Sequence, residues 1–215
     1  MLKIKVKASQ ITNLTDARYF AAKEVQWLTF NFTEGGNNYI DPMKARAMFE
    51  WVEGPRIVGE FDGLTADEIN FYTEGYQLAH IQVGNATMVE AVFDLKATSI
   101  IKEIVVDASM NAKILRGVMR PFAALVEAFQ LDFETHQLDF LSLKNGDFSL
   151  NLEDLKSLCA EFKVILAIDF QSINLDELLN LNLYGLNLRG GDEEKVGIKS
   201  FDELDDILDE LEIEE

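Results

Sequence analysis

The stretch Arg56-Ile-Val-Gly-Glu-Phe61, followed by Thr65-Ala-Asp-Glu68, decides the fold because it holds one complete structural unit. Its first part is a short apolar and β-branched run, which is typical of a buried strand. Its second part is a capping box, in which a threonine and a glutamate three residues later satisfy free N–H groups at the start of a helix. A strand that leads directly into a helix is the repeating unit of a parallel sheet.

The same order of strand and helix repeats along the whole chain. The expected strands cover about residues 3–8, 27–32, 56–61, 78–83, 100–106, 139–143, 163–168 and 183–188. The expected helices cover about 13–24, 87–95, 111–129 with an interruption near Pro121, 152–162, 175–181 and 201–211, and two more start at Asp41-Pro42 and Thr65. Eight such units in 215 residues predict an α/β fold, a small (β/α)8 TIM barrel. An open doubly wound sheet is the alternative, but it usually has a Gly-rich turn where this chain has Ser9-Gln10.

Composition limits the possible partners. The chain has 38 Asp and Glu against 19 Lys and Arg, a formal net charge of −19, which argues against nucleic acid and anionic membranes as partners. A small molecule or a protein partner remains open. One cysteine, Cys159, excludes a disulfide framework, and the two histidines, His80 and His136, leave little material for a zinc site.

The chain shows no linker or low-complexity segment, so we expect one domain over residues 1–215. An acidic C-terminal helix and tail are expected from about residue 200, as a solvated face or as an interaction tail. No run of ~18 apolar residues is present, and the start lacks the continuous apolar core of a signal peptide. These features predict a cytoplasmic protein.

Several segments resemble the phosphoribosylanthranilate isomerase family of tryptophan biosynthesis, itself a small (β/α)8 barrel. Lys7-Ala-Ser-Gln-Ile-Thr-Asn13 is similar to the family's opening Lys-Ile-Cys-Gly-Ile-Thr-Asn. The run from Gly185 to Ser200 resembles its Gly-Val-Asp-Val-Ser-Ser-Gly-Val-Glu segment and a downstream Pro-Gly-x-Lys-Asp. Tyr39-Ile-Asp-Pro42 and Ile81-Gln-Val83 are similar to its Tyr-Val-Ser-Pro and Val-Gln-Leu. The resemblance thus extends over the whole chain in order and spacing.

The resemblance implies an Amadori rearrangement, an aldose-to-ketose isomerisation that uses no cofactor and needs a general acid and a general base. In the family the base is the first-strand cysteine, and here that position holds Ser9. The acid is an aspartate that ends strand six, and the expected strand at 139–143 aligns that position with Lys144. A serine hydroxyl is a very weak base, and an unperturbed lysine, with a pKa near ~10.4, is a poor acid at neutral pH.

The substrate-binding positions implied by the family are changed as well. The arginine that holds the anthranilate carboxylate aligns with Asn38, and the phosphate-binding glycines after strand seven align with Ile168 and Asp169. Asp169 would place a negative charge beside a phosphate dianion. At the end of strand eight, the positions that correspond to the family's substrate-binding residues are Asn187, Arg189, Gly190 and Gly191.

Three hypotheses follow. The first is a barrel that has lost the family's catalytic pair and phosphate cradle and acts by binding. The second is a true isomerase that uses rearranged groups. The third is a new activity at the barrel mouth, with Lys144 as a Schiff-base lysine. The structural alternative to the third hypothesis is that Lys144 and Arg189 form ion pairs with Asp169. The candidate mouth residues at the strand ends are Ser9, Asn31, Glu60, Gln82, Asp107, Lys144, Asp169, Asn187 and Arg189.

Overall fold

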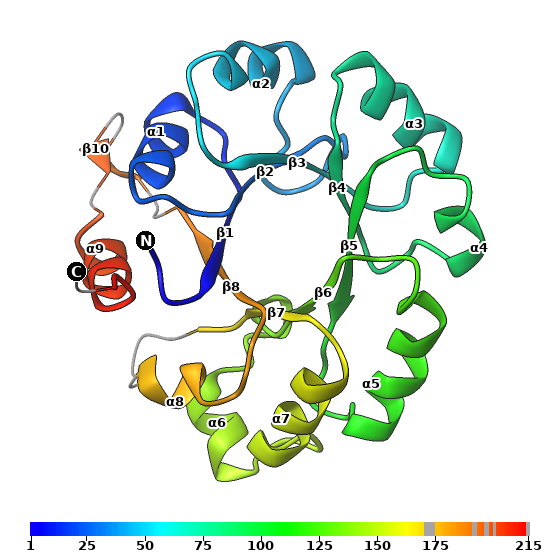
Figure 1. Cartoon of the computed structure of the whole chain (residues 1–215), viewed down its shortest axis with the longest axis vertical. Coiled ribbons are helices and arrows are strands. Elements are labelled where there is room, and N and C mark those ends of the chain that lie inside the picture. The colour runs from blue at the N-terminus through cyan, green and yellow to red at the C-terminus, as the bar shows by residue number, and fades with distance from the viewer. Residues whose placement is uncertain (170–174, 191–192, 196–197, 200, 214–215) are drawn as a thin grey trace.

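The structure, a computed structural model, is a closed barrel of eight parallel strands that pair in the order in which they occur in the chain (Figure 1). It describes residues 1–169, 175–190, 193–195, 198–199 and 201–213. The barrel strands are β1 Lys5–Ser9, β2 Trp27–Asn31, β3 Arg56–Phe61, β4 His80–Val83, β5 Ser99–Val105, β6 Ala128–Asp132, β7 Val164–Ala167 and β8 Gly185–Arg189. The expected TIM barrel is confirmed.

Helices surround the sheet, and a small hairpin follows β8. The helices are α1 Leu14–Ala22, α2 Pro42–Phe49, α3 Ala66–Gly75, α4 Val89–Val92, α5 Ala112–Met119, α6 Phe140–Asn145, α7 Leu152–Glu161, α8 Leu175–Leu179 and α9 Asp202–Glu210, with short 3-10 turns at Arg120–Phe122 and Glu134–His136. The hairpin pairs β9 Glu193–Lys195 with β10 Ile198–Lys199.

The helix starts follow the capping signals in the sequence. The Asn13 side chain accepts a hydrogen bond from the Asp16 N–H at 2.9 Å, which caps α1. Asp41 accepts from the N–H groups of Met43 and Lys44, and Pro42 occupies the first turn of α2. At α3, Thr65 and Glu68 form the expected reciprocal capping box. Local side-chain chemistry therefore places these helices.

Strand six and the helices around it differ from the expectation. The segment 139–143, expected as strand six, lies in α6, and the end of the expected helix 111–129 is strand β6. The cause at α6 is Asp139, whose carboxylate accepts from the Ser142 N–H at 2.8 Å and the Ser142 hydroxyl at 2.9 Å. Its apolar residues, such as Phe140, thus face the core from a helix, and two helices, α6 and α7, separate β6 from β7.

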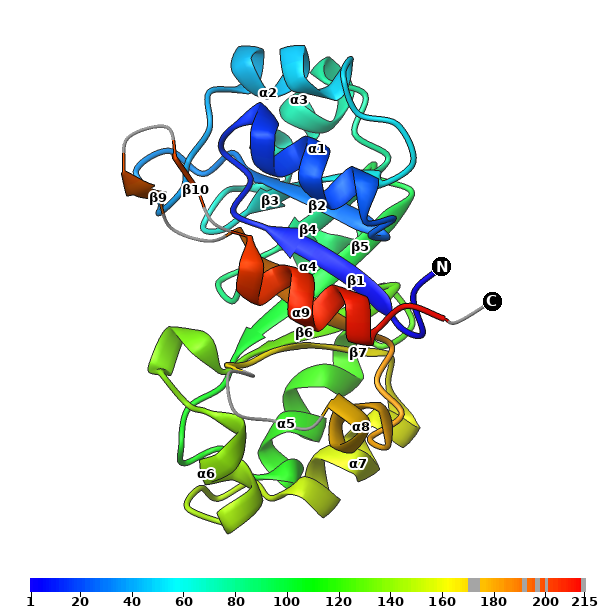
Figure 2. The same cartoon turned by 90° about the vertical axis from the view of Figure 1, so that its left-hand side faces the viewer.

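The two ends of the described chain meet beside the barrel (Figure 2). The Lys3 N–H donates to the Leu211 carbonyl at 2.8 Å, and Leu2 forms a β-bridge with Glu212. Helix α9 packs next to α1, where the Lys23 ammonium contacts carboxylates of Asp205 at 2.9 Å and Asp209 at 2.7 Å. The expected acidic C-terminal helix is present, and part of its charge is paired.

The α6 cap gives a test of the strand-six correction. Replacing Asp139 with alanine should cost about 1 kcal/mol of unfolding free energy at pH 7, because the two acceptor contacts to Ser142 are lost. These contacts also hold the pKa of Asp139 below its usual value. A lowered folded pKa adds stability above the unfolded pKa, so the cost should shrink as the pH falls through the folded pKa.

Chemical denaturation at pH 7 and at pH 3 measures both effects. Asp147→Ala, at an exposed position just after α6, is the matched control and should change the unfolding free energy by less than about 0.5 kcal/mol. An equal, small effect of the two substitutions at pH 7 would mean that 139–143 is not a capped helix.

Candidate functional site

Polar side chains fill the carboxyl-terminal half of the barrel interior. Residues paired across parallel strands point to the same side, and the register pairs Lys7 with Asn187, Asn31 with Glu60 and Glu103 with Gln130. Below them an apolar cluster fills the amino-terminal half: Trp27, Val58, Ile101, Ala128 and Ile165. Since apolar branched residues usually fill such barrels, a polar layer at the carboxyl-terminal end marks the candidate site.

Lys7 lies at the centre of this layer. Its side chain is fully buried, and its ammonium donates to Glu60 Oε1 at 2.9 Å, Gln130 Oε1 at 2.8 Å and Asn187 Oδ1 at 3.2 Å. An ammonium has three N–H donors, and these acceptors match that number. The charge is therefore held in place by β3, β6 and β8 together.

Glu103 is the second charged group of the layer. Its Oε1 accepts from Gln130 Nε2 at 2.9 Å and from Gln82 Nε2 at 3.2 Å. Burial raises the pKa of Glu103 to about 7, the neighbouring Glu60 carboxylate adds to the rise, and Lys7 opposes it. A carboxyl group with a pKa near neutrality can give or take a proton at physiological pH.

Ser9, the position of the family's base, ends β1. Its hydroxyl donates to the Leu188 carbonyl at 3.4 Å and accepts from Asn187 Nδ2 at 3.1 Å. Asn187 thereby joins Ser9 to Lys7, because its Oδ1 accepts from the Lys7 ammonium. Neither partner of the hydroxyl is a base, so the serine is held as a hydrogen-bonding group rather than activated.

The structure changes which residue occupies the position of the family's general acid. Because β6 ends at Asp132, this aspartate, and not Lys144, occupies the end of strand six. Lys144 lies on α6, and its ammonium is 2.8 Å from both carboxylate oxygens of Glu177. The prediction that Lys144 stands at a strand end is wrong.

Asp132 is buried, and its carboxylate organises the turn that follows β6. One oxygen accepts from the backbone N–H groups of Glu134 at 2.8 Å and Thr135 at 3.1 Å, and the other accepts from the Thr135 hydroxyl at 2.5 Å. The signal for this residue was available in Ala128-Phe-Gln-Leu-Asp132, where Gln130 and Asp132 alternate with apolar residues.

The rim of the mouth carries Arg189 with an acidic and an amide neighbour. Arg189 Nε lies 2.5 Å from Glu134 Oε2, and burial raises the pKa of Glu134 while the guanidinium opposes that rise. The Gln10 carboxamide lies within 3.2 Å of Arg189 and 2.9 Å from the Asn38 amide nitrogen. Gln10 takes the place of the glycine in the resembled motif and has a φ of 61°, a left-handed conformation that favours glycine.

The remaining predicted positions lie in different surroundings. Ile168, just after β7, is fully buried, Asp169 beside it is exposed, and Gly190 follows β8. Gly191 lies outside the described residues. The expected ion pairing of Lys144 and Arg189 occurs, but the pairs that the structure gives are with Glu177 and Glu134.

Three of the other candidate mouth residues have distinct roles. Gln82 belongs to the interior layer through its bond to Glu103. Asn31 holds the loop after β2, since its amide donates to the Asn37 carbonyl at 2.8 Å. Asp107 accepts from the N–H and hydroxyl of Ser109 and so closes the turn after β5.

Two other kinds of site are absent from the residues that the structure describes. Among those residues, no group of three or more His, Cys, Asp or Glu side chains is arranged to hold a metal ion. Within the same residues, no helix is both long and apolar enough to cross a membrane. Burial raises the pKa of the Cys159 thiol to about 12, which disfavours the reactive thiolate.

Several solved structures are similar to this chain over almost its whole length. The phosphoribosylanthranilate isomerase of Thermus thermophilus matches with 25% identity and a TM-score of 0.75, over 97% of this chain and 98% of that one. The Pyrococcus furiosus enzyme shares 19% identity with a TM-score of 0.70, over 96% and 97%. The Thermotoga maritima enzyme shares 18% identity with a TM-score of 0.72, over 93% and 94%.

No protein-family model matches the sequence, and no curated protein matches it. The structural matches, together with the order of motifs along the chain, support a phosphoribosylanthranilate-isomerase-like barrel.

The raised pKa of Glu103 predicts a pH-dependent stability. An unfolded glutamate titrates near ~4.3, whereas Glu103 in the barrel titrates at about 7. Between these values the unfolded chain loses its proton first, so ionisation of Glu103 lowers the free energy of unfolding as the pH rises from about 4 to 7. Glu103→Gln keeps an acceptor for Gln82 and Gln130 and removes this loss.

Urea denaturation at pH 5 and pH 8 measures the difference between the variant and the parent. Between pH 5 and pH 8, the free energy of unfolding of the variant relative to that of the parent should rise by on the order of 2 kcal/mol. Glu90→Gln, an exposed change on α4, should show no such gain. A difference that stays constant from pH 5 to pH 8 would show that Glu103 titrates normally.

Proposed function

We propose that this protein is a diverged phosphoribosylanthranilate-isomerase-like barrel that does not catalyse the Amadori rearrangement and acts by binding a small molecule or a protein partner in the cytoplasm. One observation carries the proposal: the position of the base is the Ser9 hydroxyl, bonded to Asn187 and to a backbone carbonyl. Removing the C2 proton of the substrate requires a base in that place, and a hydroxyl held in this way cannot supply one.

The charges at the mouth support the same conclusion. Glu60, Glu103, Asp132 and Glu134 contribute carboxyl groups to the interior and rim, while Lys7 is paired with Glu60 and Arg189 with Glu134. A phosphorylated sugar would have to break one of these pairs or accept the repulsion of the acids. Asp169, at a phosphate-binding glycine of the family, adds a further negative charge.

The second candidate function is an isomerase that uses rearranged groups. Two observations favour it: an aspartate, Asp132, ends strand six as in the resembled family, and Glu103 has a pKa of about 7 in the mouth. In that case Asp132 would act as the acid and Glu103 as the base. The third hypothesis, a Schiff-base Lys144, has lost its basis because that ammonium is paired with Glu177 outside the strand ends.

A coupled assay with phosphoribosylanthranilate separates the two functions. We expect no turnover above the uncatalysed rate, with the Thermus thermophilus isomerase as the active reference. Ser9→Cys restores a thiol at the base position and should remain inactive, because Asn38, Asp169 and Asn187 still lack the family's substrate contacts.

Two results would contradict the proposal. Turnover by the parent protein that disappears in Glu103→Gln and Asp132→Asn would identify a rearranged isomerase. Turnover by Ser9→Cys alone would show that the substrate site is intact and that only the base is missing.

A further inference from the structure

A cavity lies outside the barrel, between the loop that follows β2 and helix α3. Its volume is about 480 Å³, and it is lined by Phe32, Glu34, Leu64, Asp67, Glu68, Phe71 and Tyr72. Phe32 follows β2 directly and is fully buried, whereas Phe71 is 72% exposed. None of these residues belongs to the polar layer around Lys7.

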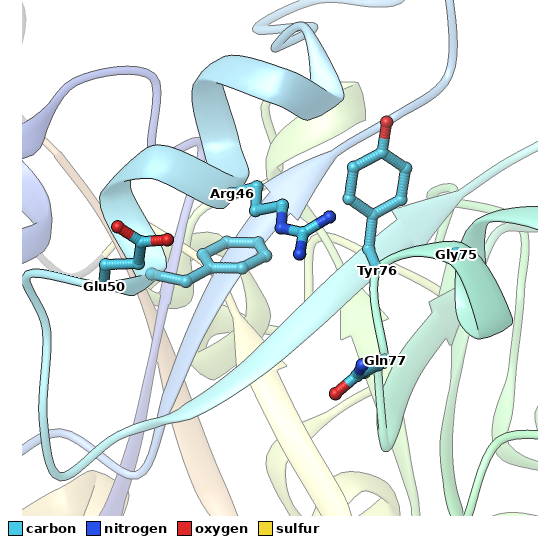
Figure 3. A pocket seen from close by; sticks show the side chains of 6 residues that line it. Arg46, Glu50, Gly75, Tyr76 and Gln77 are labelled. Atoms are coloured by element: carbon cyan, nitrogen blue, oxygen red, sulfur yellow. The ribbon is translucent and has the colours of Figure 1, made fainter.

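Aromatic rings in two orientations form the walls. Tyr72 is parallel to Phe32, with an interplanar angle of 2° and 6.0 Å between the ring centroids. Phe71 stands at 82° to Tyr72 with 5.7 Å between the centroids. The Tyr76 ring contacts both of the parallel rings, with its centroid 6.2 Å from that of Phe32 and 6.3 Å from that of Tyr72. Tyr76 also lines a smaller cavity of about 240 Å³, together with Arg46 (Figure 3).

The charge at this cavity is entirely negative. Glu34, Asp67 and Glu68 line it, and within the described part of the chain none of the three forms a salt bridge. The Glu68 carboxylate is bonded to Thr65 in the capping box. The carboxylates of Glu34 and Asp67 are therefore the ones that a ligand in this cavity would meet. Burial raises the pKa of Tyr72, and the nearby Glu34 carboxylate raises it further.

Ordinary structural roles account for only part of this arrangement. Acids in the first turn of α3 interact favourably with the helix dipole, which explains Asp67 and Glu68. That explanation does not cover Glu34, which lies in a different loop, or the exposure of a phenylalanine beside the cavity. A cavity that combines an exposed phenylalanine, a tyrosine and carboxylates that form no salt bridge among the described residues is complementary to a cation that carries apolar surface.

We propose that this cavity binds a small quaternary ammonium compound, with the trimethylammonium group of choline as its simplest representative. The positive charge would lie beside the Phe71 and Tyr72 rings and near the Glu34 and Asp67 carboxylates, while the methyl groups contact Leu64 and Phe71. A primary ammonium is more strongly hydrated and loses more on entering such a cavity. The net charge of −19 also attracts cations to the whole surface.

The test is a calorimetric or NMR titration of the full chain with choline and with its uncharged isostere, 3,3-dimethylbutan-1-ol. Choline should bind at least about fivefold more tightly than the isostere, because the two differ only in charge. Phe71→Ala and the pair Glu34→Gln with Asp67→Asn should each weaken choline binding about threefold to fivefold. These positions are at the surface, so the variants should fold.

Phe93→Ala is the matched control, since Phe93 is 70% exposed at the end of α4, away from the cavity, and should leave choline binding unchanged. Equal binding of choline and the isostere, no binding of choline, or the same loss in Phe93→Ala would overturn the proposal. Binding to phosphatidylcholine vesicles without binding of free choline would also overturn it, because a membrane surface would then be the ligand. The rearrangement assay has no bearing on these outcomes.

Discussion

The buried ammonium of Lys7 is the constraint on which the barrel interior depends. A charge taken out of water is stable only when hydrogen-bonding partners surround it, and here Glu60, Gln130 and Asn187 are those partners. They come from β3, β6 and β8, so strands on opposite sides of the barrel must be aligned to within the length of a hydrogen bond. Gln130 also donates to Glu103, which extends the same requirement to β5.

This network also extends to the mouth of the barrel. Asn187 donates to Ser9 and accepts from Lys7, so one amide joins Ser9, at the position of the family's base, to the central cation. At the rim, Arg189 is held by Glu134. Many polar groups of the mouth therefore bond to one another, although Gln82 Oε1 is buried without a hydrogen-bond partner among the described residues. A ligand for this mouth must exchange hydrogen bonds with groups that already have partners, which favours neutral or weakly charged molecules over dianions.

Much of the fold could be predicted from the sequence because its helices begin with strong local signals, such as Asn13, Asp41 and the Thr65–Glu68 capping box. Strand six is harder to predict, because its inward residues, Gln130 and Asp132, are polar, so that only their alternation with apolar residues indicates a strand. When strand six is placed at residues 139–143, the position of the family's acid aligns with Lys144 instead of Asp132. Contacts such as Lys7 with Gln130, which are 123 residues apart, depend on barrel closure and leave no local trace in the sequence.

Closure of the barrel between β1 and β8 has a consequence for how the chain acquires its structure. Lys5 pairs with Gly185, so the final seam joins segments that are among the most distant in the chain, and contacts of such long range slow folding. Until that seam forms, β1 and β8 are unpaired edges and Lys7 lacks Asn187. An incompletely closed barrel would expose the edges of β1 and β8, and exposed strand edges favour association between chains.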